Sequence, residues 1–275
     1  MTDLYAVVGN PIAQSRSPEI HAAFAAQTGQ DIRYEKKYVE LGQFAEQAQQ
    51  FFGAGGRGLN VTVPFKLDAF EFADTLTERA TTAGAVNTLA LQPDGRILGD
   101  NTDGAGLVAD LKNHLDWTIQ GRSVLIVGAG GATRGALLPL LQEQPARLHI
   151  ANRTAQKAQQ LAQDFSEYGR ITASGLDGVP DGFDLIINAS AASLSGELPP
   201  LSPRALADGC RAYDMVYGAQ PTPFMHWATG LGAEVSDGLG MLVGQAAESF
   251  YLWRGVRPQV APVLSTLRER LQHTG

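Results

Sequence analysis

The fold is decided by residues 122–154, RSVLIVGAGGATRGALLPLLQEQPARLHIANRT. Within it, Ser123–Val127 is a short apolar run typical of a strand buried in a parallel sheet, and glycines follow at once at positions 128, 130 and 131. A helix and a second strand complete one βαβ unit. Glycines at such a turn let the backbone approach a bound pyrophosphate, which the free N–H groups of the helix N-terminus stabilise. The stretch therefore predicts a dinucleotide site, with an ordinary glycine-rich turn as the alternative.

The glycine motif departs from G-x-G-x-x-G at its sixth position, which holds Thr133, so the turn alone is a weak indication. The end of the second strand adds to it. An NAD enzyme usually has an acid there for the ribose 2′-OH, whereas this chain has Asn152, Arg153 and Thr154. An arginine with polar neighbours, and Lys157 one turn on, suits a 2′-phosphate through charge-assisted hydrogen bonds. The sequence therefore predicts NADP as the cofactor, and solvated surface cations are the alternative.

Composition limits the class of protein. With 275 residues the chain is long enough for two domains, and 18% charged residues with 31 glycines are typical of a compact α/β protein. A net charge of −7 argues against a nucleic-acid surface. No apolar run has the length of a membrane span, so we expect a cytoplasmic protein without a membrane role. Cys210, the only cysteine, is expected to be a half-buried residue before a strand, and no ligand spacing predicts a metal site.

The N-terminal segment predicts a strand over residues 4–10 and a helix from Ser17 to about Thr28. Ser15 and Ser17 then lie in the strand-to-helix loop, near a helix N-terminus that favours an anionic group such as a substrate carboxylate. The alternative is that Ser17 only caps the helix. His21, one turn into the helix, is expected to be a packed histidine rather than a catalytic one.

The α/β pattern continues with a strand, a helix and a strand over residues 33–41, 44–55 and 57–63. The third strand ends in NVTVPFK, where a proline stops the ladder and leaves Asn60, Thr62 and Lys66 at a carboxyl end. Ligands of open α/β sheets bind beyond such ends. Because most lysines lie on the surface, a surface role for Lys66 is the alternative.

A hairpin is predicted next, formed by residues 85–91 and 95–101 after a short helix over 76–85. Asn87 begins its first strand, and Asp103 follows its second strand in the stretch GDNTDG. Asp103 precedes a predicted helix over 105–115, for which it could serve as N-cap. That helix is the expected domain boundary, where we expect the cleft that brings substrate and cofactor together.

The rest of the chain alternates helices and strands, expected over residues 155–165, 184–190, 211–217, 223–232, 233–238, 240–255 and 260–272. This alternation predicts a doubly wound sheet. The strand ends hold Asn188, Ala189 and Ser190, and then Met215, Val216 and Tyr217, all expected on the nicotinamide side of the crevice. Gln245 is the polar exception beside an apolar helical stripe.

The motifs that carry a family resemblance are SRSPEIH, NVTVPFK, GAVNT, GDNTDG, GAGGATRG, NRT, DMVY and GLGMLVGQAAESF. Their order and spacing resemble those of the shikimate dehydrogenases over nearly the whole chain. The resemblance implies an α/β substrate domain formed by residues 1–103 and 239–275, and a Rossmann-like NADP domain over 104–238. It also implies the reduction of 3-dehydroshikimate to shikimate with NADPH, in chorismate and aromatic amino acid biosynthesis.

The resemblance also implies roles for single residues. Lys66 and Asp103 would form the catalytic pair, and Ser15 and Ser17 would bind the substrate carboxylate with help from Tyr217. The substrate site as a whole would comprise Ser15, Ser17, Asn60, Thr62, Lys66, Asn87, Asp103, Tyr217 and Gln245. The cofactor would contact Gly128, Ala129, Gly130, Gly131, Ala132, Asn152, Arg153, Thr154, Lys157, Asn188, Ala189, Ser190, Met215, Val216 and Gly238. Lys157 stands where many relatives have a second arginine, so the strength of the NADP preference stays open.

The implied chemistry agrees with these residue types, because hydride addition to a ring ketone builds charge on oxygen and needs a cation or proton donor beside it. One alternative is a quinate/shikimate dehydrogenase that prefers NAD, which Arg153 disfavours, as does Ser17, where such relatives tend to have threonine. Another is a non-catalytic NADP-binding regulator, which would have lost Lys66 or Asp103. The expected partner is a small-molecule substrate, and the expected state is a monomer or homodimer.

Overall fold

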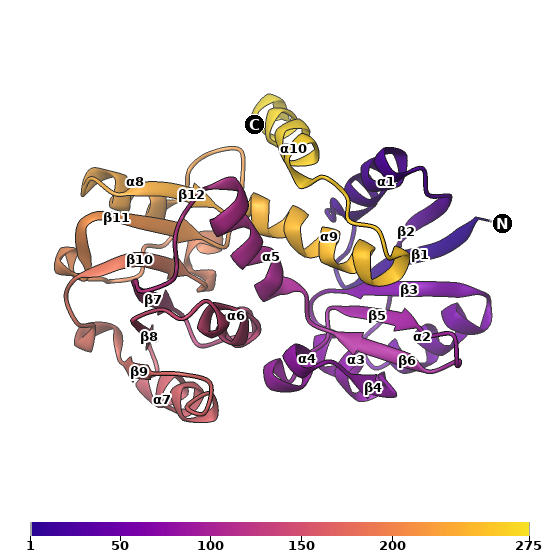
Figure 1. Cartoon of the computed structure of the whole chain (residues 1–275), viewed down its shortest axis with the longest axis horizontal. Helices are drawn as coiled ribbons and strands as arrows, with labels where there is room; N and C mark the ends of the chain where they lie inside the picture. Colours follow the sequence, from indigo (N-terminus) through magenta and orange to yellow (C-terminus); the bar gives the residue numbers. More distant parts are fainter. Residues whose placement is uncertain (1, 275) are drawn as a thin grey trace. The chain divides into compact units, whose positions relative to one another are not determined.

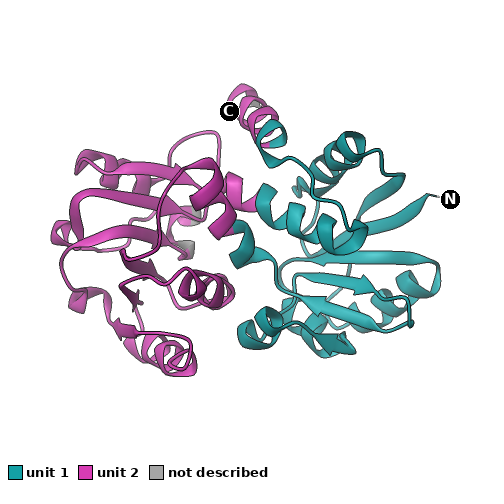
Figure 2. Cartoon of the chain, in the orientation of Figure 1, with its two compact units in different colours: residues 1–106, 243–263 teal, residues 107–242, 264–275 magenta. Residues whose placement is uncertain are grey.

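The computed structural model describes residues 2–274 (Figure 1). The chain forms two compact units, residues 1–106 with 243–263 and residues 107–242 with 264–275 (Figure 2). The expected functional domains are 1–103 with 239–275 and 104–238. Their boundaries lie a few residues from those of the compact units, and residues 264–275 are assigned to the first domain instead of the second unit. Those functional boundaries stay a prediction. Over residues 2–274 we find no helix with the length and apolar character that a membrane span needs.

The first unit is built on a mixed sheet of order β2-β1-β3-β5-β6-β4. Its strands are β1 (Asp3–Gly9), β2 (Ile32–Tyr38), β3 (Gly56–Val61), β4 (Thr75–Leu76), β5 (Thr88–Leu91) and β6 (Ile97–Asp100). Strand β1 is parallel to β2 and β3, whereas β5 is antiparallel to both β3 and β6. The predicted hairpin is confirmed, since Leu91 of β5 pairs with Ile97 of β6.

Helices cover both faces of this sheet, as α1 (Ser17–Thr28), α2 (Phe44–Gly53), α3 (Lys66–Phe72), α4 (Glu78–Ala83) and α9 (Leu239–Arg254). Because side chains alternate along a strand, β1 serves both faces. Val8 joins a buried cluster with Phe44 of α2. Tyr5 points to the opposite face, where its ring lies 4.7 Å from that of Trp253 in α9. Helix α9, from the last part of the chain, therefore completes a core that the N-terminal residues begin.

The second unit has a sheet of order β12-β11-β10-β7-β8-β9, with every neighbouring pair parallel. Its strands are β7 (Ser123–Val127), β8 (Arg147–Ala151), β9 (Ile171–Ser174), β10 (Phe183–Asn188), β11 (Leu206–Asp214) and β12 (Glu234–Asp237). Counted in chain order this is the doubly wound 3-2-1-4-5-6 arrangement, read from the other edge. The predicted doubly wound sheet is therefore confirmed, and its strand order reverses between β7 and β10.

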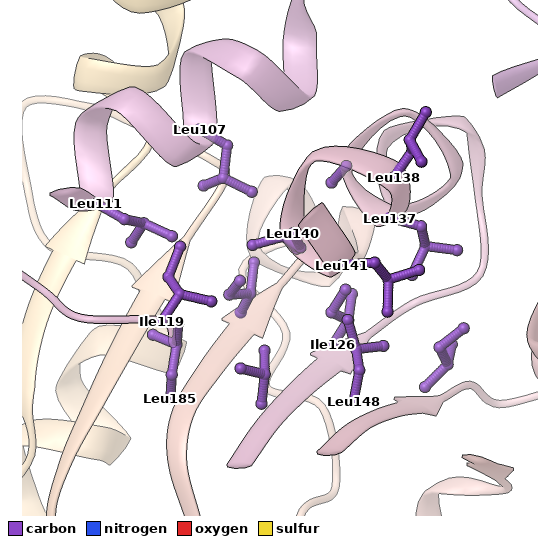
Figure 3. Close-up of a cluster of buried hydrophobic side chains, with 14 of the residues drawn as sticks. Leu107, Leu111, Ile119, Ile126, Leu137, Leu138, Leu140, Leu141, Leu148 and Leu185 are labelled. Carbon is purple, nitrogen blue, oxygen red and sulfur yellow. The ribbon is translucent and has the colours of Figure 1, made fainter. Parts of the chain in front are cut away.

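The main helices of the second unit are α6 (Gly131–Gln142), α7 (Ala155–Asp164) and α8 (Pro223–Gly230). Alternate residues of β7 supply two buried clusters: Ile126 packs on the α6 side and Leu125 on the α8 side. Figure 3 shows leucines of α6, including Leu140 and Leu141, directed toward the strands. Each such side chain stabilises the fold by about 1.5–3 kcal/mol when fully buried.

Three elements contribute residues to both units: α5 (Asp103–Ala109), α9 and α10 (Val260–Thr274). A π-helical turn over Asp110–His114 follows α5, where one α-helix to 115 was predicted. The Asp110 carboxylate in that turn is buried and accepts a 2.7 Å hydrogen bond from the Tyr213 hydroxyl. Burial raises the pKa of Asp110.

Three short elements were not predicted, and one strand begins earlier than expected. Helix α3 was not expected, because Pro64 indicated only the end of a strand, and β4 and β9 are too short for their periodicity to be recognised. Strand β11 begins at Leu206 rather than at 211, so Cys210 lies inside a strand and is only 2% exposed. Burial raises the pKa of the Cys210 thiol to about 12, which makes it a poor nucleophile.

Candidate active site

Lys66 and Asp103 meet in the first unit, with Lys66 Nζ 2.5 Å from Asp103 Oδ2. Lys66 is the first residue of α3, and Asp103 is the first residue of α5. The two are 37 positions apart in the sequence and come together because β3 and β6 both lead into helices on this side of the unit. Their side chains are 31% and 15% exposed, so both are partly desolvated and still accessible to a ligand.

Asn87 links this pair to its surroundings. Its Nδ2 donates to Asp103 Oδ1 at 2.8 Å and lies 3.4 Å from Gln245 Oε1. Its Oδ1 accepts from the Thr102 N–H and from the Thr88 hydroxyl, both at 2.9 Å. Donors on one side and acceptors on the other fix the orientation of the amide. The structure thus brings together four residues that the sequence proposed for the substrate: Lys66, Asn87, Asp103 and Gln245.

Asn60 extends the network into the buried interior. Its Nδ2 donates to Ser249 Oγ at 2.9 Å and to Thr88 Oγ1 at 3.1 Å, and its Oδ1 accepts from Tyr34 Oη at 2.7 Å. Ser249 and Thr88 are themselves 2.8 Å apart. A continuous run of hydrogen bonds therefore leads from Tyr34 to Lys66. Sequence reasoning missed Thr88, Thr102 and Ser249, because hydroxyl residues in strands and helices carry no spacing that marks a site.

The loop that carries Asp103 is held by a second ion pair that was also missed. Asp100 is 1% exposed and accepts two hydrogen bonds from Arg79, at 2.7 and 2.6 Å. Burial alone would raise the pKa of Asp100, but the hydrogen bonds and charge of Arg79 outweigh it and the pKa lies below its ordinary value. Asn101, the next residue, accepts from the Asp103 N–H at 3.2 Å. The buried pair and this turn fix where Asp103 begins α5.

Ser15 and Ser17 lie together at the start of α1, with their hydroxyl oxygens 3.2 Å apart. The alternative that Ser17 only caps the helix was wrong: Ser17 is the first helical residue, and its N–H donates to Ser15 Oγ at 3.3 Å. Ser17 is buried and Ser15 is half-buried. Thr62, which follows β3, donates its N–H to the Val8 carbonyl at 2.9 Å and is half-buried.

His21 is packed rather than catalytic, as the sequence indicated. It is fully buried and stacks on Tyr34, with ring centroids 4.2 Å apart. Its two ring nitrogens have no hydrogen-bond partner among the described residues. Burial lowers the pKa of His21 to about 3, and Asn60, which lies nearby, offsets this only in part. The ring is therefore neutral at physiological pH.

The glycine turn of the second unit follows β7. Gly128 has a φ of 116°, and a side chain there would lie 3.1 Å from the backbone of Ala189 and Ser190. Thr133, which stands where the motif has its last glycine, is buried and donates its hydroxyl to the Gly128 carbonyl at 2.9 Å. The side chain of Thr133 therefore holds the turn, which explains why the imperfect motif still forms it.

Two cavities adjoin this turn, with volumes of about 350 and 320 Å³. The first is lined by Gly128, Asn152, Arg153 and Ser190, and by a loop that includes Leu198 and Pro199. The second is lined by Ala129, Gly130, Gly131, Arg134 and Lys157 among others. Apart from the adjoining residues and the backbone of α6 itself, no described protein atom lies within 4 Å of the places where side chains would project from Gly130 and Gly131. Cationic side chains around an open glycine turn fit the phosphates of a dinucleotide.

The remaining residues proposed for the cofactor lie at the carboxyl ends of β10, β11 and β12. Asn188 Oδ1 accepts from the Ser190 N–H at 3.1 Å. Gly238 donates to the Val216 carbonyl at 3.3 Å, and a side chain at Gly238 would overlap the Met215 carbonyl. Tyr217 is half-buried in the loop after β11 and belongs to the second unit, whereas Ser15 and Ser17 belong to the first. Its predicted help in carboxylate binding stays a prediction.

The second unit has a doubly wound sheet whose glycine turn is bordered by Arg134, Arg153 and Lys157, and the first unit holds a lysine and a carboxylate in contact. This combination is typical of dinucleotide-dependent oxidoreductases. Three family models match the chain: the shikimate dehydrogenase substrate binding domain over residues 7–89, shikimate / quinate 5-dehydrogenase over 110–195, and the shikimate 5′-dehydrogenase C-terminal domain over 238–268. The chain belongs to the shikimate dehydrogenase family.

Individual relatives cover almost the whole chain. A shikimate dehydrogenase (NADP(+)) of Cellvibrio japonicus is 58% identical over 98% of this chain and 99% of its own. The structure of an Ael1 enzyme from Pseudomonas putida superposes with a TM-score of 0.93 and 44% identity, over 97% of this chain and 98% of its own. Shikimate 5-dehydrogenase from Thermus thermophilus, in complex with NADP(H) and shikimate, gives a TM-score of 0.88 and 31% identity, over 98% of this chain and 100% of its own.

These similarities confirm the predicted family, the α/β fold with a Rossmann-like unit, and the enzyme class. They also confirm NADP as the cofactor, since the curated relatives are named for it and solved relatives hold it. The roles of single residues are not tested by similarity and stay proposals.

Proposed function

We propose that this chain interconverts 3-dehydroshikimate and shikimate, with NADPH as hydride donor and NADP as acceptor. The observation that carries the proposal is the Lys66–Asp103 pair, 2.5 Å apart and tied by Asn87 into a buried polar network. This pair lies in the unit whose first part matches the substrate binding domain of the family. The NADP(H) and shikimate named for the Thermus thermophilus structure support the same pair of ligands.

The cofactor would supply the hydride that adds to the ring carbonyl carbon, so the chain has only to bind, orient and stabilise the reacting groups. As the C=O bond becomes a C–O bond, negative charge develops on its oxygen. Lys66 Nζ carries protons and would stabilise that charge and then deliver one of them to the oxygen. Asp103 accepts from Lys66 and from Asn87, so it holds the ammonium in place and supports its charge. In the reverse direction Lys66 would take the proton from the hydroxyl.

The other groups of the first unit would position the ring. Gln245 presents an amide beside Asn87, and an amide suits ring hydroxyls, which both donate and accept. Asn87 is 3% exposed and bonded to protein at both ends of its amide, so its part would be to hold Asp103 toward the ring. The hydroxyls of Ser15 and Ser17, which lie together at the start of α1, would hold the substrate carboxylate. Thr62 would contact the ring from the end of β3. Asn60 is 5% exposed and bonded on both sides by protein, so its part would be to hold Thr88 and Tyr34 in place.

In the second unit, Arg153 and Asn152 would hold the 2′-phosphate, with Thr154 and Lys157 at the start of α7. Arg153, Thr154 and Lys157 are all exposed, so their side chains are accessible to a charged ligand. The turn from Gly128 through Ala132 would receive the pyrophosphate. The cytoplasmic location, the absence of a nucleic-acid partner and the monomeric or homodimeric state remain predictions from the sequence.

The test is a spectrophotometric assay of NADPH formation with shikimate, and then with quinate, at matched concentrations of NADP and NAD. The proposal expects turnover with shikimate and NADP, with slower turnover when either is replaced. Faster reaction with quinate and NAD would favour the alternative dehydrogenase. No reaction with either acid, although NADP binds by calorimetry, would favour a non-catalytic NADP-binding protein.

A further inference from the structure

Asp214 is a buried carboxylate that the reaction does not use. It ends β11, begins the stretch DMVY and is 0% exposed. Burying a carboxylate is costly unless its oxygens accept hydrogen bonds. The four partners of Asp214 are all neutral donors, and together their hydrogen bonds offset the free energy of burying the side chain.

The four hydrogen bonds come from three separate segments. Asp214 Oδ1 accepts from Asn188 Nδ2 at 3.2 Å and from the Val216 N–H at 3.1 Å. Asp214 Oδ2 accepts from Ser193 Oγ and from Thr222 Oγ1, each at 2.6 Å. One side chain therefore joins the ends of β10 and β11 to the segment after each strand.

These segments carry most of the residues proposed for the nicotinamide side of the cofactor. Because Asn188 Nδ2 faces Asp214, its Oδ1 is turned toward Ser190, which donates to it from both N–H and hydroxyl. Val216, fixed through its N–H, accepts at its carbonyl from Gly238. The order imposed by Asp214 thus extends to the end of β12.

We propose that Asp214 is a positioning residue for NADP: it fixes the segments after β10 and β11 in the geometry that binds the nicotinamide half of the cofactor. The inference rests on the proposed cofactor site and deepens it. Asp214 itself is covered by these segments and acts only through them. A binding site on loops needs such support, since loops that must order themselves on binding lower the affinity.

The test compares Asp214→Ala with Asp214→Asn by isothermal titration with NADP and, separately, with NADPH. Alanine removes all four acceptor contacts, and we expect Kd to rise at least tenfold for both cofactor forms. Asparagine keeps an oxygen for the two N–H donors, and the hydroxyls of Ser193 and Thr222 can turn to accept from its NH₂ group. We therefore expect Asp214→Asn to rescue binding, with Kd within about threefold of wild type.

Two controls separate positioning from stability. Asp110→Ala removes another buried carboxylate of the same unit, one bonded to the neighbouring residue Tyr213. It should lower the unfolding temperature and leave the Kd for NADP unchanged. In the Asp214 variants the KM for shikimate at saturating NADP should rise less than the Kd for NADP, because every proposed substrate group except Tyr217 belongs to the first unit.

The inference is overturned if folded Asp214→Ala, checked by circular dichroism, binds NADP like wild type, or if Asp214→Asn loses as much affinity as alanine. Should Asp214→Ala not fold, Ser193→Ala removes one bond to Asp214 Oδ2 from a half-buried side chain and should raise the Kd for NADP about threefold. An unchanged Kd would refute the inference. A wild-type protein that does not bind NADP would instead refute the cofactor assignment on which the inference rests.

Discussion

The buried imidazole of His21 makes the stability of the first unit depend on pH. Burial lowers its pKa from 6.5 to about 3 in the folded protein. Between these pKa values the unfolded chain binds a proton that the folded protein does not. The free energy of unfolding therefore has its full value above pH 6.5 and falls as the pH drops toward 3. At pH 5 the expected loss is about 2 kcal/mol, from roughly 1.5 pH units at about 1.4 kcal/mol each.

The variant His21→Phe keeps an aromatic ring against Tyr34 but removes the titration. Urea unfolding between pH 7.5 and 5 should show that wild type loses about 2 kcal/mol more than the variant. The matched control is Phe24→Leu, a neighbour in the same aromatic cluster, which should be less stable at every pH while keeping the wild-type slope. An identical pH slope in wild type and His21→Phe would refute the reasoning. His149, whose pKa burial lowers to about 4, adds a similar slope that none of these variants alters.

Two further predictions concern ligand contacts. Arg153→Ala should weaken NADP binding by about 1.5–3 kcal/mol and change NAD binding little, because it removes a charge-assisted contact to the 2′-phosphate; equal losses for both cofactors by fluorescence titration would contradict the assignment. Ser15→Ala should raise the KM for shikimate by roughly tenfold and leave that for NADP nearly unchanged, with thermal unfolding measured alongside because Ser15 Oγ also accepts from the Ser17 N–H. A matching rise in both KM values would exclude Ser15 from the substrate site.

The general architecture could be predicted from the sequence because its pattern is local. The apolar run before Gly128 and the alternation of helices and strands fix a doubly wound sheet, and the turn between Leu91 and Ile97 fixes a hairpin. The strand orders of the two sheets were not predicted, because the right-handed crossover of a βαβ unit leaves open where the order reverses. Helix α3 was missed because it spans only seven residues soon after Pro64, too few for a helical period to show.

Arg153 at the end of β8 could be proposed from the residues alone, because an acid is usual at that place in NAD enzymes. The roles of Lys66 and Asp103 came from the family resemblance, since a surface lysine and a helix N-cap were the alternatives. The supporting network of the site could not be predicted. Ser249 lies in α9 and Thr88 in β5, and only the folded chain places their hydroxyls 2.8 Å apart. The contacts of Asp214 also could not be predicted, since nothing in DMVY shows that three segments converge on one carboxylate.

The most direct test of the proposed mechanism is whether Lys66 and Asp103 act as one unit in the chemical step. Steady-state kinetics of Lys66→Ala and Asp103→Asn should each show kcat lower by roughly 10² to 10⁴, with KM changed much less. The double variant should fall well short of the product of the two losses, because each single change already disables the pair.

A matched control is Lys112→Ala, which breaks an exposed lysine–carboxylate pair of similar length, 2.7 Å to Glu143, and should leave kcat within about twofold of wild type. With folding checked by circular dichroism, a large and non-additive loss of kcat is the predicted result. A kcat near wild type in Lys66→Ala, or losses that multiply in the double variant, would contradict the central claim.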